Sequence, residues 1–145
     1  MSDTAKRKIM DLIARRNHSE KELRTKLHGK IADEDGGLEA IDEAIAHAKK
    51  NNWLEDPTEL AHRLADTLHR RHKGIEYINN YLNEKGLPSV EADSALELKK
   101  ALEVITNKFT EDFKFSREDQ ARVGRLLTSR GFDSETVRKV IYEKL

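Results

Sequence analysis

Residues 9–27 read IMDLIARRNHSEKELRTKL, and they decide the fold because the same kind of passage returns twice along the chain. The second copy, residues 64–82, reads LADTLHRRHKGIEYINNYL, and the third, residues 123–141, reads VGRLLTSRGFDSETVRKVI. In each copy, aliphatic residues stand at matching positions on both sides of a polar turn, and the copies begin 55 and 59 residues apart. A repeat of this length is a helix–turn–helix unit that buries its apolar face by stacking on its neighbours.

The repeat predicts an all-α protein built from tandem three-helix units in an elongated array. We expect repeat 1 at residues 1–55, repeat 2 at residues 56–113, and a truncated repeat 3 of two helices at residues 114–145. No segment of alternating β-branched residues is long enough to predict a strand. Arrays of this kind form long surfaces, which favours a macromolecular partner over small-molecule chemistry.

Helix starts are marked by capping residues. Ser19 and Glu22 form the S-x-x-E pattern of a capping box, and Asp56 followed by Pro57 is typical of a cap and first helical position. Asp133 is expected to cap the last helix, and the helix before it is expected to start at Ser116. These signals predict eight helices separated by short polar breaks.

The sixth expected helix spans residues 90–109 and carries an apolar stripe of Ala95, Leu98, Leu102 and Ile105. Aromatic residues are few, and for each of them we expect core packing, with stacking on a partner or on unpaired bases as the alternative. These residues are Trp53, Tyr77, Tyr81, Phe109, Phe113, Phe115 and Phe132.

Composition agrees with thin amphipathic helices, since hydrophobic and charged residues each make up 37% of the chain. The chain has no cysteine, which excludes disulfides, thiolate metal sites and thiol nucleophiles. It also has no long apolar run and no signal-peptide core, so we expect a soluble, cytoplasmic protein with no membrane contact.

The net charge is zero, but its sign alternates along the chain. Residues 1–30 carry +5, residues 31–60 carry −7, residues 61–90 carry +2, residues 91–113 carry −3 and residues 114–145 carry +3. The helix pairs around the turns are therefore basic, and the helices between them are acidic. Either oppositely charged neighbours attract one another within the fold, or a basic stripe runs along one side of the array.

Basic residues recur at one structural position, immediately before or within each turn. Arginine presents a planar fork of donors that suits a carboxylate or a phosphate. Cations at a helix C-terminus can equally serve to offset the helix dipole, and both interpretations remain open. The candidate partner-binding residues are Arg15, Arg16, Arg24, Lys26, Arg70, Arg71, Lys73 and Arg130.

The turn sequences resemble those of the RecX family. Residues 12–27 look like the opening repeat of that family, and Trp53-Leu54-Glu55-Asp56 resembles its joint between repeats. The middle turn keeps Arg70, Arg71 and Gly74 of the family pattern but lacks a second glycine and a proline. Residues 130–135 match the closing repeat, so the resemblance covers nearly the whole chain in the right order.

The resemblance implies a regulator of RecA, the recombinase that polymerises on single-stranded DNA. Proteins similar to this one are curved arrays of three-helix repeats that lodge in the groove of the RecA filament and modulate, usually inhibit, its activity. RecA in its filament form is therefore the expected partner of a monomeric protein. A basic face could also approach DNA directly.

Catalytic signals are absent from the sequence, which contains no phosphate-binding loop, nucleophile elbow or H-E-x-x-H motif. His69 and His72 lie three residues apart without a third ligand in sequence, and the carboxylates are expected on solvent-facing stripes. We therefore expect no catalytic, metal or cofactor site. The rival functions are a helix–turn–helix protein that binds nucleic acid by itself, and a scaffold that binds another helix.

Overall fold

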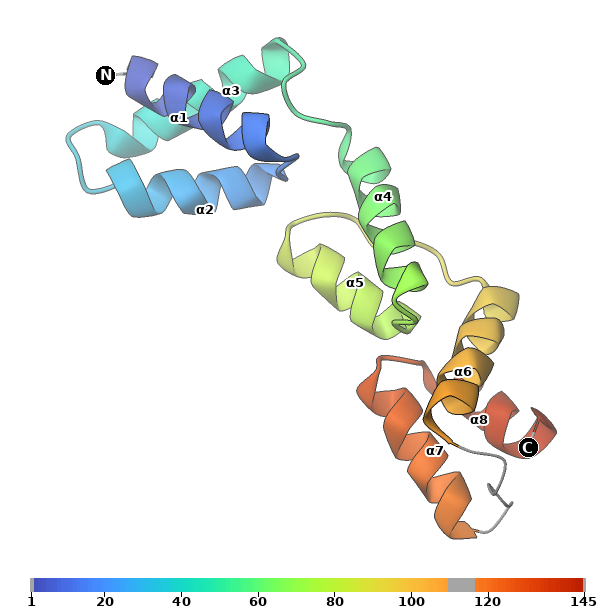
Figure 1. The fold of residues 1–145 in the computed structure, drawn as a ribbon. Helices are drawn as coiled ribbons and strands as arrows, with labels where there is room; N and C mark the ends of the chain where they lie inside the picture. Colours follow the sequence, from blue (N-terminus) through green and yellow to red (C-terminus); the bar gives the residue numbers. More distant parts are fainter. Residues whose placement is uncertain (1, 110–116, 145) are drawn as a thin grey trace. The chain divides into compact units, whose positions relative to one another are not determined.

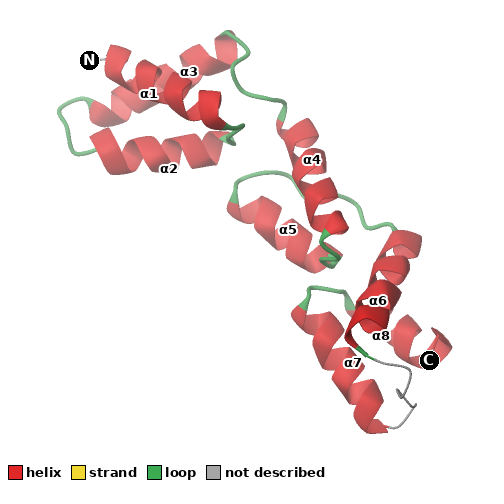
Figure 2. Cartoon of the chain, viewed as in Figure 1, coloured by secondary structure: helices red, strands yellow, loops and turns green. Residues whose placement is uncertain are grey.

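The computed structural model describes residues 2–109 and 117–144, and within these residues every regular element is a helix (Figure 1). Figure 2 shows helices joined by loops, with no strand in the described part of the chain. The helices are α1 (Ser2–Arg15), α2 (Glu20–Ile31), α3 (Gly37–Lys50), α4 (Pro57–Arg70), α5 (Ile75–Glu84), α6 (Ser94–Lys108), α7 (Arg117–Ser129) and α8 (Ser134–Lys139), and α8 continues as a π-helical turn, η1 (Val140–Lys144). The predicted all-α class is confirmed.

The predicted caps form where the sequence placed them. Ser19 accepts a hydrogen bond from the backbone of Glu22 at 3.1 Å, and the Glu22 carboxylate accepts one from the Ser19 N–H at 3.3 Å, which completes the capping box. Asp56 accepts from the Thr58 N–H at 2.8 Å, and Asp133 caps α8 in the same way. The cap predicted at Ser116 lies outside the described residues.

Backbone contacts divide the chain into two compact units. Unit 1 contains Met1–Ala61 and Asn83–Pro88, and unit 2 contains His62–Leu82 and Ser89–Leu145. The repeat boundaries at residues 55 and 113 stay a prediction.

Unit 1 is organised around one apolar core shared by α1, α2 and α3. The buried side chains of this core come from all three helices and include Ile9, Leu23, Leu27 and Ile45. Helix α2 runs past Gly29 to Ile31, which is buried in the same core.

In unit 2, α6 shares a core with α7 and α8. Ala101, Val104 and Ile105 of α6 are buried with Val123 and Leu127 of α7, and the cluster continues into Phe132 and Val140. The two C-terminal helices therefore do pack against a third helix, and that helix is α6. Phe132 is buried, as predicted.

The sixth helix differs from the prediction in its start and in its buried face. It begins at Ser94 behind the cap Asp93, because the amide of Asn79 holds Val90 in the preceding loop through hydrogen bonds to both its N–H and its C=O. Ala95 is exposed, and Leu98 and Leu102 are only partly buried. Ile105 is buried as predicted, but the centre of the buried face is shifted to Ala101 and Val104, with Leu98 and Leu102 at its edge.

Candidate partner-binding surface

The turn between α4 and α5 (turn 2, residues 70–74) reverses the chain without a glycine at its tightest point. His72 takes the left-handed conformation with φ of 60°, and the Lys73 N–H reaches back to the Leu68 carbonyl at 3.1 Å. This is the geometry of a Schellman motif, in which glycine is the usual left-handed residue. The turn between α7 and α8 (turn 3, residues 130–133) repeats it, with Gly131 at φ of 89° and a 3.1 Å bond from the Phe132 N–H to the Leu127 carbonyl.

Turns 2 and 3 dock against each other, backbone to backbone. The Gly74 N–H donates to the Arg130 carbonyl at 2.9 Å, and the Glu76 N–H donates to the Gly131 carbonyl at 2.9 Å. A Cβ atom on Gly74 would lie under 3.0 Å from the Gly131 backbone, and one on Gly131 would lie under 3.0 Å from Tyr77. Gly74 is therefore needed for close approach. We call the two docked turns the turn 2–turn 3 junction.

The junction brings together four of the predicted partner-binding residues. Arg70 and Arg71 are exposed, and Arg130 is partly buried. The ammonium group of Lys73 lies 4.7 Å from the centre of the Tyr77 ring. Tyr77 itself is 39% exposed, so its expected place in the core is wrong; its backbone packs on Gly131 while the ring stays at the surface under Lys73.

The other predicted residues lie in unit 1, where two of them bind carboxylates of their own chain. Arg16 pairs with Glu22 at 2.9 Å, and Arg24 pairs with Asp42 at 2.7 Å. Burial would raise the pKa of Glu22, but hydrogen bonds from Arg16, the Ser19 backbone and Lys85 outweigh it and lower the pKa to about 2. Arg16 and Arg24 thus have structural roles of their own, whereas Arg15 is exposed at the end of α1.

Lys26 contacts a buried histidine rather than a carboxylate. Its Nζ lies 3.0 Å from Nε2 of His18, whose side chain is almost fully buried and whose Nδ1 lies 2.9 Å from the Arg16 carbonyl. Because an ammonium group can only donate, this contact requires an unprotonated Nε2.

One polar cluster escaped the sequence reasoning. Glu97 is 1% exposed and Lys100 is 3% exposed, and they form an ion pair on the core side of α6. Lys100 also lies 2.8 Å from Nδ1 of His69. The expectation that carboxylates occupy only solvent-facing stripes is therefore wrong. The available signal was helical phase, since Glu97 stands four residues before Ala101 and seven before Val104, both of which are apolar.

The remaining predicted side chains have ordinary surroundings. Trp53 is half-buried against the unit 1 core, with its ring edge-on to that of His47 at 5.0 Å, as expected for a residue at a helix junction. His72 binds Glu103 at 2.6 Å. Across residues 2–109 and 117–144, no three histidine or acidic side chains are grouped so that they could hold a metal ion. Phe113 and Phe115 lie outside the described residues.

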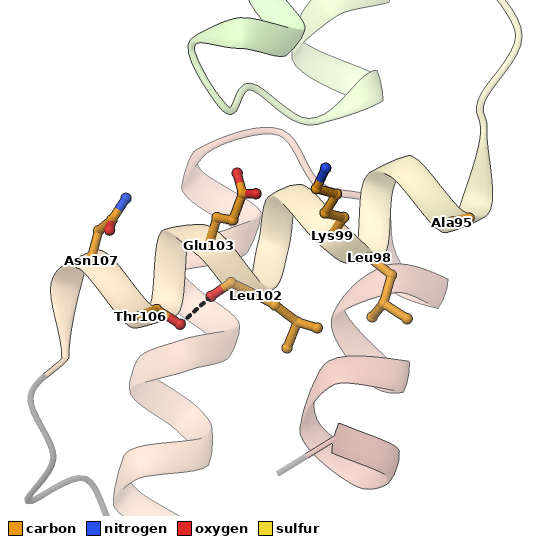
Figure 3. Close-up of a pocket in the computed structure, with 7 residues that line it drawn as sticks. All are labelled: Ala95, Leu98, Lys99, Leu102, Glu103, Thr106 and Asn107. Carbon is orange, nitrogen blue, oxygen red and sulfur yellow. Dashed lines mark hydrogen bonds between the residues drawn. The ribbon is translucent and has the colours of Figure 1, made fainter.

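Figure 3 shows a pocket along α6. Leu98 and Leu102 point to one side of the helix, whereas Lys99, Glu103 and Asn107 extend to the other in this view. The polar groups of this pocket do not converge on one point, so the pocket suits surface contact better than bond-making chemistry.

None of the described helices is both long enough and apolar enough to cross a lipid bilayer.

The buried His18 and the partly buried His69 make stability depend on pH. Burial lowers the pKa of His18 and His69, and the Lys100 charge lowers the pKa of His69 further. The unfolded chain therefore protonates these two imidazoles more readily than the folded chain does. Their contribution to the free energy of unfolding is fully present above about pH 6.5 and is lost as the pH drops below it. We expect a lower urea midpoint at pH 5.5 than at pH 7.5, and a smaller difference for His18→Gln combined with His69→Gln. Equal midpoints for the wild-type protein would contradict this.

Across its described residues the chain is all-helical and displays charged turns, and such a surface suits contact with a macromolecular partner. No family model matches the chain. The regulatory protein RecX of Leptothrix cholodnii is 31% identical, over 94% of this chain and 86% of its own length. That of Yersinia enterocolitica is 28% identical, over 97% of this chain and 96% of its own. The crystal structure of RecX from Lactobacillus salivarius matches with a TM-score of 0.78 at 20% identity, over 98% of this chain and 95% of that one.

The identity to these relatives over almost their full length shows that the chain belongs to the RecX family. The relatives are named regulatory proteins, and as a member of their family this chain is a regulatory protein rather than an enzyme. The solved structure confirms the fold.

Proposed function

We propose that this protein binds RecA filaments on single-stranded DNA and modulates, in the inhibitory direction, the recombinase and ATPase activity of RecA. It would act as a cytoplasmic monomer in DNA repair, recombination and the SOS response. Membership of the RecX family supports the choice of partner. The observation that carries the proposal is the turn 2–turn 3 junction, where backbone hydrogen bonds between the turns hold the segment that carries Arg70, Arg71 and Lys73 next to the segment that carries Arg130.

The activity test is RecA-dependent ATP hydrolysis on single-stranded DNA, measured with and without the protein. We expect the rate to fall as the protein is added. A rate that does not change at any concentration would exclude modulation of RecA.

Exposed arginines are expected to contribute to binding and little to folding. Replacing Arg15, Arg70 and Arg71 by Ala should weaken co-sedimentation with RecA filaments, while the melting temperature stays nearly constant, because exposed substitutions change stability by about 0.5 kcal/mol or less. Arg16 is left in place because it holds the capping-box residue Glu22. The matched control replaces three other surface cations, Arg7, Lys30 and Lys50, which are also exposed. Equal binding by both triple variants would show that the turns are not the contact surface.

A second candidate function is binding of DNA without RecA. A small pocket at the junction favours it, because His72, Asn107, Lys108 and Arg130 line it together with Val104, and such donors suit a phosphate. Affinity for single-stranded or duplex DNA in the absence of RecA, falling with salt, would support this candidate over the first.

A further inference from the structure

Helix α5 begins without a capping side chain of its own. Gly74 stands where Ser19 caps α2 and Asp133 caps α8, and its carbonyl accepts the first helical bond, from the Ile78 N–H at 3.0 Å. Any side chain there would meet the Gly131 backbone, so the docking of the two turns removes the usual cap. The first amides of α5 therefore need acceptors from elsewhere in unit 2.

Helix α6 and turn 3 supply these acceptors. The Ile75 N–H donates to the Glu97 carboxylate at 2.6 Å, and the Glu76 N–H donates to the Gly131 carbonyl at 2.9 Å. A carboxylate at a helix N-terminus is also favoured by the helix dipole. Glu97 thus acts as the missing cap of α5, from 22 residues further along the chain.

Lys100 completes the arrangement on the other side of Gly74. Its ammonium group pairs with the second carboxylate oxygen of Glu97 and donates to the Lys73 carbonyl at 2.7 Å. It also lies 5.7 Å from the centre of the Phe132 ring. The buried pair therefore holds the residues before and after Gly74, and it contacts turn 3 as well.

Net stability does not explain this pair. Desolvating two charges costs about as much as their attraction returns, and apolar residues of similar volume often replace buried pairs without loss. A buried pair with four directed contacts does, however, fix the path of a backbone. What it fixes here is the turn that carries Arg70, Arg71 and Lys73.

We propose that Glu97 and Lys100, which are hidden from any partner, are positioning residues that lock turn 2 and so align its basic side chains with Arg130 for the partner. The inference rests on the proposed function, because the partner in question is the RecA filament. Glu97 and Lys100 thus affect binding of the filament although both side chains are buried and cannot contact it.

Two double variants test the inference. Glu97→Gln with Lys100→Met keeps an acceptor for the Ile75 N–H and removes both charges, whereas Glu97→Leu with Lys100→Met removes the acceptor as well. We expect amide hydrogen exchange at Gly74 and Ile75 to rise by about tenfold or more in the Leu/Met variant, and filament affinity to fall by about tenfold, the effect of losing one strong contact. The Gln/Met variant should lie between it and the wild-type protein in both measurements.

The matched control is Glu135→Leu with Lys139→Met, which removes an exposed pair of the same residue types from α8 in the same unit. It should leave both the turn amides and the affinity unchanged. A purely structural role would make affinity follow the melting temperature across the three variants, whereas positioning makes it follow the protection of the turn amides.

Three results would overturn the inference: protected turn amides in the Leu/Met variant, unprotected amides with wild-type affinity, or affinity that follows the melting temperature. If the Leu/Met variant does not fold, the Gln/Met variant decides by the same comparison. Failure of the proposed function is a separate result, because wild-type protein that does not bind filaments contradicts that function, while amide exchange still reports whether the pair locks the turn.

Discussion

Replacing Gly74 by Ala is expected to destabilise unit 2 by about 3 kcal/mol or more. The added Cβ would overlap the backbone of Gly131 and Phe132, and backbone cannot swing aside as the end of a flexible side chain can. Relief would require turns 2 and 3 to separate, which would break the bonds that Gly74 and Glu76 donate to turn 3. In thermal unfolding, we expect the melting temperature to fall by on the order of 10 °C.

A matched control is available in the same chain. Gly29 lies inside α2, and a Cβ there would have no atom within 4 Å. Gly29→Ala should therefore raise stability by about 0.5–1 kcal/mol, because alanine loses less conformational freedom in a helix. A lower melting temperature for Gly74→Ala and a higher one for Gly29→Ala would show that the steric clash at turn 2, and not helix propensity, sets the effect at Gly74. A Gly74→Ala protein that melts like the wild type would contradict the docking of the turns.

The sequence was informative wherever a structure is set by neighbouring residues. Ser19 with Glu22, Asp56 with Pro57, and Asp133 each mark a helix start, and each forms the expected cap because the bonded groups lie within three residues. The apolar positions of the repeat, such as Leu23 and Leu27, are buried as expected, because helical spacing places them on one face of α2.

Features that depend on contacts between distant elements could not be predicted from the sequence. The start of α6 depends on Asn79, which binds Val90 from eleven residues away, and the buried face of α6 depends on how α7 and α8 pack on it. Glu97 looked like a surface carboxylate because the Ile75 N–H, its partner outside α6, is brought to it only by the packing of turn 2 on α6, whereas Lys100 is a neighbour on the same helix. For the same reason, the pairing of Arg24 with Asp42 could not be predicted from the sequence.

The candidate site was predicted as a set of residues but not as a geometry. The arginines that precede the turns looked equivalent in sequence, yet Arg16 is tied to a carboxylate whereas Arg70 and Arg71 remain exposed. Arg24, which was expected to extend the same face, also binds a carboxylate. Recurrence at one position in a repeat shows that the position matters without showing why. The contacts that each basic side chain makes in the structure show whether it holds its own fold together or is available to a partner.

The largest binding effect is expected from the state of RecA. The protein carries basic turns in both of its units, and a filament presents the same site many times, so several contacts can form at once. Multivalent contact can raise apparent affinity by roughly 10²–10⁴ over a single contact. We therefore expect much tighter binding to RecA filaments on single-stranded DNA than to a polymerisation-defective RecA, and weaker binding as salt rises, because the contacts are charged and partly exposed.

Replacing charged side chains is a better test of multivalent binding than deleting part of the chain. Removing the chain from residue 116 onward would expose Ala101, Val104 and Ile105, which α7 and α8 bury, so lost binding could reflect an unfolded unit 2. Replacing Arg70 and Arg71 by Ala leaves that core intact and removes one group of contacts. If contacts in both units count, this variant should lose most of its advantage for filaments while its affinity for the polymerisation-defective RecA changes little. Equal affinity of the wild-type protein for both forms of RecA would leave a one-site binder, for which the repeated turns have no role in recognising the filament.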